Sequence, residues 1–182
     1  MKRLVVLAGT CLLPLALGLA SCTKDAAQPA PTMPTMRRLS EAQYRNVIAD
    51  VFGDEIQVSG RFDRPERVDG LLETGTVTMD VTSSAYERYD QLARSIAAQV
   101  VDPKNREILI PCKPADATKA DRACAEAFYR HVGRFLYRRP LNDKEVATRL
   151  DIADATAAKA GDFYKGLASG LASLLVTPTF LF

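Results

Sequence analysis

The chain has 182 residues, of which 47% are hydrophobic and 25% are charged. This balance is typical of a folded globular protein and excludes a mostly disordered chain. The net charge of +2 comes from Lys2 and Arg3, because the rest of the chain carries 22 basic and 22 acidic side chains. A neutral chain offers no electrostatic basis for binding nucleic acid, so we expect no nucleic-acid partner.

The first 22 residues have the pattern of an export signal. Two basic residues precede an apolar run that ends in Leu-Ala-Ser-Cys at positions 19–22. A positive start, a short apolar run and small residues before the cut predict a signal peptide at 1–21, cleaved between Ser21 and Cys22. A transmembrane anchor or a buried first helix is the alternative. The apolar run is shorter than the roughly 20 residues that a membrane span needs, and it contains Pro14.

The last four residues of this signal resemble a bacterial lipobox. In such signals the cysteine, here Cys22, becomes the first residue of the mature chain and receives lipid. Thr23 follows it, whereas retention in the inner membrane favours Asp at that position, so we expect anchoring in the outer membrane, facing the periplasm. Residues 22–36 are rich in proline, alanine and threonine, which predicts an extended tether.

A first helix is predicted at residues 40–52. Ser40 is a typical N-cap, and Gln43 completes a capping box. Gly53 ends the helix. The apolar side chains of one face are those of Tyr44, Val47, Ile48, Val51 and Phe52.

Residues 54–82 lack helical periodicity. The segment 75–81 alternates loosely and predicts a short strand, which would pair with residues 56–58 as a β-hairpin near 55–82. Phe62 lies among charged residues in a long loop. Such a loop either carries function or is a solvated connector whose one aromatic side chain packs in the core.

A second helix is predicted from Ser84, with Glu87 completing a capping box, to the stop at Asp102-Pro103. Its expected core face consists of Tyr86, Tyr89, Ala93, Ile96, Ala97 and Val100. The two tyrosines suggest an aromatic corner of the core, with ligand stacking as the alternative.

Cys112 and Cys124 flank a polar segment of eleven residues before the clearest helix of the chain. Outside the cytosol two unlipidated cysteines normally pair, so a disulfide is predicted. A zinc site formed with His131 is the alternative, but it lacks a fourth ligand and the usual close cysteine spacing. The expected core stripe of this helix consists of Cys124, Phe128, His131 or Val132, and Phe135.

A charged row with a four-residue spacing lies along the same helix and consists of Glu126, Arg130, Arg134 and Arg138. Arginine binds phosphate and carboxylate well, so His131, Arg134 and Arg138 are candidate ligand contacts. The alternatives are a solvated charged face and, for His131, a hydrogen-bonded packing residue, an axial ligand or a proton carrier. No catalytic residue, metal site or cofactor is predicted.

Two further helices follow Pro140. Asn142 and Glu145 predict a capping box, and Gly161 predicts the end of that helix. Its expected core face consists of Val146, Leu150, Ala153, Ala157 and Ala160. The last helix begins near residue 162, and Gly166 and Gly170 should allow another helix to approach closely. The apolar residues 180–182 suggest that the chain continues into another domain.

Two groups of residues resemble a bacterial family of envelope proteins of unknown function, best known from planctomycetes. The matching residues are 37–40, 44, 46, 50 and 53 in one group, and 124–134, 138–141, 145, 162–163, 166–167, 178 and 180–181 in the other. The resemblance implies small helical modules that precede a larger domain, with a fused c-type cytochrome in some members. It implies no catalytic residues, and this chain has no Cys-x-x-Cys-His haem motif.

We therefore expect a mainly α protein, a small bundle of about five helices. The predicted divisions are a first helical module at 37–101 and a second at 102–182. The expected function is that of an exported lipoprotein in the cell envelope, acting as a helical scaffold or binding module for an envelope protein or a larger domain. The alternative is an N-terminal fragment of a larger enzyme or electron-transfer-associated protein.

Overall fold

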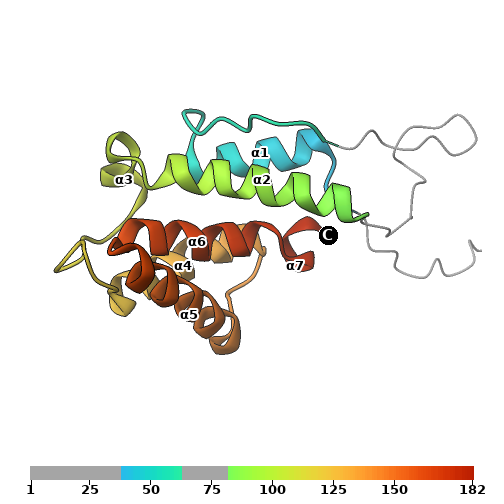
Figure 1. Cartoon of the computed structure of the whole chain (residues 1–182). Coiled ribbons are helices and arrows are strands. Elements are labelled where there is room, and N and C mark those ends of the chain that lie inside the picture. Colours follow the sequence, from blue (N-terminus) through green and yellow to red (C-terminus); the bar gives the residue numbers. More distant parts are fainter. Residues whose placement is uncertain (1–37, 63–81) are drawn as a thin grey trace, which may run out of the picture. The chain divides into compact units, whose positions relative to one another are not determined.

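Seven α-helices make up the described part of the computed structural model, which covers residues 38–62 and 82–182 (Figure 1). They are α1 (Glu41–Phe52), α2 (Ser83–Val100), α3 (Pro103–Leu109), α4 (Arg122–Leu136), α5 (Asp143–Ala160), α6 (Phe163–Leu175) and α7 (Pro178–Leu181). The mainly α fold class is thus confirmed. The five long helices are those that the sequence predicts, whereas the short α3 and α7 were not predicted.

The predicted β-hairpin finds no support in the described residues, which contain no strand, and residues 56–58 are irregular. The other half of the hairpin, 75–81, lies outside the described residues, as do the signal peptide and the tether. The division into modules at residue 101 also stays a prediction.

Local hydrogen bonds at the helix ends explain why α1 and α5 form where the sequence predicts them. The Ser40 hydroxyl accepts from the Gln43 backbone N–H, while the Gln43 side chain accepts from the Ser40 N–H at 2.9 Å. Asn142 and Glu145 make the same reciprocal pair at the start of α5. Gly161 ends α5 in the left-handed conformation that glycine adopts without strain, with φ of 59°.

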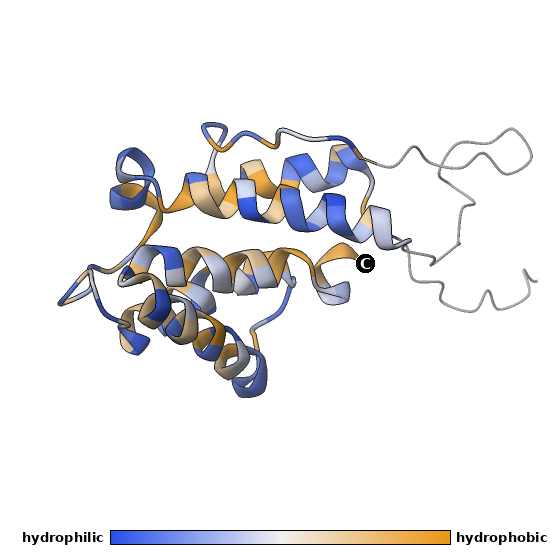
Figure 2. Ribbon diagram, viewed as in Figure 1, coloured by the Kyte–Doolittle hydropathy of each residue, from blue (hydrophilic) through white to orange (hydrophobic). Residues whose placement is uncertain are grey.

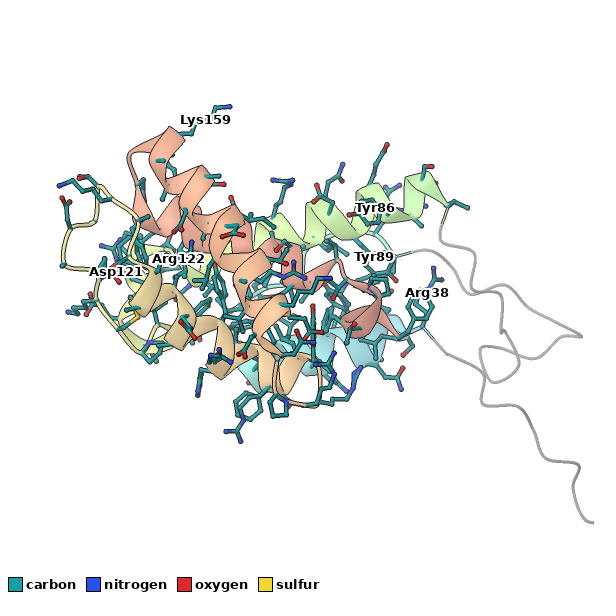
Figure 3. All side chains as sticks on the ribbon, turned by 90° about the horizontal axis from the view of Figure 1, so that it is seen from below. Arg38, Tyr86, Tyr89, Asp121, Arg122 and Lys159 are labelled. Atoms are coloured by element: carbon teal, nitrogen blue, oxygen red, sulfur yellow. A yellow bond between two sulfur atoms is a disulfide. The ribbon has the colours of Figure 1, made fainter. Side chains whose placement is uncertain are left out.

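The start of α2 differs from the prediction. Thr82 is the N-cap, and its hydroxyl accepts from the Ala85 N–H at 3.2 Å, so the capping box of Ser84 and Glu87 does not form. Threonine is also a favoured N-cap, and here the cap lies two residues before the predicted Ser84. The core face is led by Ala85 and Tyr89, whereas Tyr86 is 50% exposed and was wrongly assigned to it (Figure 3).

Helix α6 lies between α2 and α5 and is buried on both sides (Figure 1). Its buried residues are Phe163, Gly166, Leu167, Gly170, Leu171, Ala172, Leu174 and Leu175. Two glycines allow this packing, as the sequence predicts. A Cβ at Gly166 would lie 2.4 Å from the Ala153 carbonyl oxygen of α5, and one at Gly170 would lie 2.0 Å from the Tyr129 hydroxyl oxygen of α4. That hydroxyl donates to the Leu167 carbonyl oxygen at 2.9 Å.

Both ends of the described chain meet in one aromatic cluster. The ring centroid of Tyr44 in α1 lies 5.3 Å from that of Phe62, 5.3 Å from that of Phe180 in α7, and 6.0 Å from that of Tyr89 in α2. Phe62 therefore packs against the core, as expected if its loop is a connector with one aromatic side chain in the core. Phe180 is fully buried, so its side chain is part of the core of this fold.

The outer helices are amphipathic, and Figure 2 shows hydrophilic and hydrophobic positions alternating along α1 and α2. On α4 the core stripe runs through Phe128, Val132 and Leu136, so the assignment of Phe135 to the core was wrong. Because α4 continues with its 3.6-residue period, Leu136 and not Phe135 falls on the buried face. Ala160 at the end of α5 is likewise exposed. Among the described helices none combines the length and the apolar character needed to cross a membrane.

Replacing Gly166 by alanine should destabilise the fold by about 1–3 kcal/mol, because the added methyl group would collide with the backbone of α5. The better helix propensity of alanine, at most about 1 kcal/mol, should not compensate. Ser169→Ala on the same helix is the control, with an expected change within about 0.5 kcal/mol. Urea unfolding measures both, and a G166A variant as stable as the parent chain would contradict the close contact.

Candidate functional site

An open groove of about 640 Å³ lies beside the C-terminal end of α4 and the turn that follows it. We call it the arginine groove, and it is lined by Arg130, Arg134, Phe135, Arg138, Arg139, Pro140 and Leu141. Four cations and one aromatic ring share this surface. This combination of charge and aromatic surface makes the groove a candidate binding site.

Acidic side chains hold two of the four arginines. Arg130 donates to Glu126 one turn earlier at 2.8 Å and to Asp143, at the start of α5, at 2.9 Å. Arg139 forms a two-pronged pair with Glu145, with distances of 2.6 and 2.9 Å. Such bidentate pairs fix the orientation of a guanidinium group. Both arginines thus join the turn and α4 to the start of α5.

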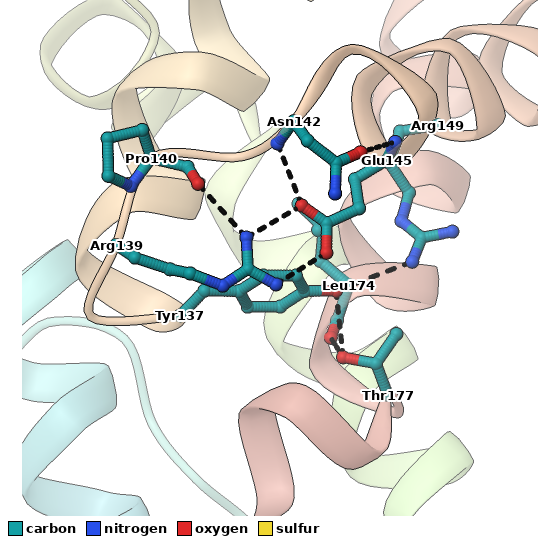
Figure 4. Close-up of polar contacts among 8 residues, drawn as sticks. All are labelled: Tyr137, Arg139, Pro140, Asn142, Glu145, Arg149, Leu174 and Thr177. Atoms are coloured by element: carbon teal, nitrogen blue, oxygen red, sulfur yellow. Dashed lines mark hydrogen bonds and ion pairs between the residues drawn. The ribbon is translucent and has the colours of Figure 1, made fainter.

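Further contacts of Asn142 and Tyr137 surround the Arg139–Glu145 pair (Figure 4). The Asn142 backbone N–H donates to the Glu145 carboxylate at 2.8 Å, and the Arg139 guanidinium lies over the Tyr137 ring, 5.4 Å from its centroid. The side-chain hydrogen bond from Arg139 is the main cause that lowers the pKa of Glu145 below its ordinary value, with a further contribution from the Asn142 hydrogen bond. Glu145 is therefore ionised at neutral pH and keeps Arg139 neutralised.

Arg149 of α5 is buried behind this network. It donates to the Tyr137 hydroxyl, which is hydrogen bonded in turn to the Thr177 hydroxyl at 2.8 Å, and Thr177 donates to the Leu174 carbonyl oxygen at 2.8 Å (Figure 4). The chain of contacts connects α5 to the turn after α4 and to the end of α6. The turn after α4, which contributes Arg138 and Arg139 to the arginine groove, is therefore connected to both α5 and α6.

Arg134 and Arg138 differ from the other two arginines. Neither forms an ion pair with a carboxylate among residues 38–62 and 82–182. Arg134 lies over the ring of Phe135, 4.8 Å from its centroid, and Arg138 donates to the Phe180 carbonyl oxygen at 3.4 Å. Both are exposed. These two guanidinium groups are thus available to an external anion.

His131 is exposed and lies next to the arginine groove without lining it. Its ring makes an edge contact with Phe135 at 5.6 Å between centroids. The structure therefore brings the three candidate ligand contacts His131, Arg134 and Arg138 to one end of α4. It adds Phe135, which sequence reasoning placed in the core. The exposure of Phe135 could have been predicted from Leu136, because Leu136 continues the spacing of the buried Phe128 and Val132 better than Phe135 does.

The Cys112–Cys124 disulfide holds the opposite end of α4, with the two Cα atoms 5.5 Å apart. Asp121 caps the same end by accepting from the Cys124 N–H at 3.0 Å (Figure 3). Because both sulfur atoms are bonded to each other, they are not thiolate ligands, and the zinc alternative does not fit this structure. No cluster of three or more potential metal ligands occurs in the described part of the chain.

Removing the disulfide should destabilise the protein by about 2–3 kcal/mol, as expected for a loop of this size. We expect the double variant C112A/C124A to lose this amount in urea unfolding and to be insensitive to added reductant, whereas the parent chain should weaken on reduction. Alkylation of the unreduced, unfolded chain followed by mass spectrometry is the check. Labelled thiols at both positions would contradict the bridge.

Replacing Glu145 by glutamine should lower the free energy of unfolding by about 1 kcal/mol at pH 7, because the charged pair with Arg139 is lost. Since folding lowers the pKa of Glu145, its contribution is present above the ordinary carboxyl pKa of about 4.3 and disappears as the pH falls below it. The difference between the variant and the parent chain should therefore shrink towards pH 3 to 4. Glu55→Gln, at an exposed position, is the control, and a difference independent of pH would contradict this role.

Two family models match the chain. Residues 37–102 match the PSD3 model, described as a protein of unknown function (DUF1587), and residues 124–182 match the PSD5 model, described as a protein of unknown function (DUF1595). No curated protein and no solved structure matches the chain significantly. The first match covers α1 and α2, and the second covers α4 to α7, including the whole arginine groove. The chain thus contains two segments similar to domains of unknown function, and the groove lies within the second.

Proposed function

We propose that this protein is a lipid-anchored protein of the bacterial cell envelope, whose helical part is a binding module. Two features of the cysteines support export. Cys22 follows small residues at the end of an apolar run, and Cys112 and Cys124 are joined as a disulfide. Disulfides persist in oxidising compartments outside the cytosol. Lipid on Cys22 would anchor the mature chain to the outer membrane, on its periplasmic side, through the tether.

The arginine groove is the observation that carries the binding role. It presents two arginines that have no carboxylate partner among residues 38–62 and 82–182, beside the half-exposed ring of Phe135. Arginine and aromatic side chains are enriched in the parts of protein surfaces that contribute most to partner binding. Ion pairs and hydrogen bonds also hold the turn that carries Arg138 and Arg139. A rigid surface loses little entropy on binding.

The family that the sequence resembles suggests the kind of partner. In that planctomycete family such modules precede a larger domain, which in some members accompanies a c-type cytochrome. A larger domain or a separate envelope protein is therefore the partner that we propose. The module would hold this partner near the membrane, within reach of the tether.

Lipidation of Cys22 is the decisive test of the anchored state. After expression in a bacterium, mass spectrometry of the membrane fraction should find a mature chain that begins with acylated Cys22. Cys22→Ala should abolish acylation and leave the precursor uncleaved at this position, because the acyl chains attach to this sulfur and to the new N-terminus. Cys11→Ala, within the signal, is the matched control and should be processed normally. A chain recovered from the soluble fraction with its N-terminus at Met1 would contradict the proposal.

A further inference from the structure

The arginine groove carries an excess of positive charge that the described part of the fold does not neutralise. Acidic side chains hold Arg130 and Arg139 in place, whereas Arg134 and Arg138 face the groove without a carboxylate. Opposite charges attract most where both partners are partly shielded from water. The groove is therefore suited to a ligand with more than one negative charge, since two of its guanidinium groups have no carboxylate partner among the described residues.

The backbone at Arg138 also points to a use of this side chain. Arg138 follows the C-cap Tyr137 and has a φ of 56°, the left-handed conformation in which glycine is usually found. A charged residue is strained there, and a glycine would relieve the strain but remove the charge. The conformation places the guanidinium of Arg138 in the lining of the same groove as Arg134.

Apolar side chains line the same groove as these two charges. Phe135 is 46% exposed, and the Arg134 guanidinium and the His131 ring hold its ring from two directions. Pro140 and Leu141 continue the apolar lining. A ligand that covers these side chains removes apolar surface from water, which is favourable. The ligand should therefore combine acidic groups with an apolar group.

The position of the groove at the end of α4 favours carboxylates over a compact phosphate. Phosphate sites commonly use the free backbone N–H groups and the positive dipole of a helix N-terminus. Here the last turn of α4 presents carbonyl oxygens and the negative end of the dipole. The guanidinium groups, which bind carboxylate and phosphate alike, are then the only attraction for an anion, and a phosphate lacks the backbone N–H donors that usually help to bind it.

We propose that the arginine groove binds an extended acidic peptide segment of a partner protein, with carboxylates on Arg134 and Arg138 and an apolar side chain on Phe135. This inference rests on the proposed role as a binding module and specifies the chemistry of its partner. It does not depend on lipidation of Cys22. Failure of the acylation test would remove the anchor, whereas failure of the peptide test would remove this ligand.

A displayed library of random peptides, selected on the full chain purified in detergent, tests the ligand chemistry. The selected peptides should be enriched in Asp or Glu next to leucine, isoleucine or an aromatic residue. The best peptide is then synthesised, together with a copy in which Gln and Asn replace Glu and Asp. The acidic peptide should bind at least about 10-fold more tightly, since it alone makes charge-assisted hydrogen bonds.

Variants of the groove test its location. The double variant R134A/R138A should weaken binding of the acidic peptide by at least about 10-fold. The control K104A/K159A also removes two exposed positive charges, but neither residue lines the groove, and its affinity should stay unchanged (Lys159 is labelled in Figure 3). Circular dichroism shows whether both variants remain folded. Phe135→Ala should weaken binding of the acidic peptide but not that of a copy with glycine in place of its apolar residue.

Several results would overturn the inference. These are a selection without acidic enrichment, equal binding of the amide copy, and equal losses in the groove and control variants. Tighter binding of inorganic phosphate or glycerol 1-phosphate than of the peptide, lost in R134A/R138A, would replace the peptide by a phosphate ligand. The first of these two probes represents free phosphate, and the second represents a lipid headgroup.

Discussion

Close packing of α6 against α2 and α5 holds the fold together. Helix α6 has α2 on one side and α5 on the other, so it connects the segment at 37–102 to the segment at 124–182. Gly166 permits backbone contact with α5, and Gly170 makes room for the Tyr129 hydroxyl. A side chain at either position would push these helices apart. The aromatic cluster around Tyr44 then closes the other end, where Leu39 donates to the Leu181 carbonyl oxygen at 2.7 Å.

With α6 in place, α4 is held at both of its ends. The disulfide and the Asp121 cap hold its first turn, and ion pairs of Arg122 with Asp151 and Asp154 join that turn to α5. About 18 Å further along the helix, the turn after it is held by Arg139 and the network behind it. The arginine groove is thus a surface on a rigid support. Such support keeps interacting groups in the geometry that recognition requires.

Two arginines of the groove form ion pairs within the fold, and the other two do not among the described residues. Carboxylates belonging to the fold hold Arg130 and Arg139, and these pairs orient the turn. Arg134 and Arg138 lie on the same surface beside an exposed aromatic ring. A chain whose charges nearly balance thus presents a locally basic surface, and local charge, not net charge, determines which partner fits a groove.

Local sequence patterns were enough to predict the five long helices, most of their ends and the pairing of Cys112 with Cys124. Caps depend on hydrogen bonds within three residues, and Cys112 and Cys124 are the only cysteines outside the first 22 residues of the sequence, so each had one candidate partner. The sequence also predicted Arg134 and Arg138 on one helix, which was wrong, because α4 ends at Leu136 and Arg138 lies in the turn after it with a φ of 56°. Packing between helices determines that Leu136 is buried while Phe135 is exposed, and that Glu126, Asp143 and Glu145 pair with Arg130 and Arg139. These features depend on which helices pack against α4 and its following turn. Contacts between residues distant in the chain are not encoded in local periodicity, so the candidate site became recognisable only once the helices were packed.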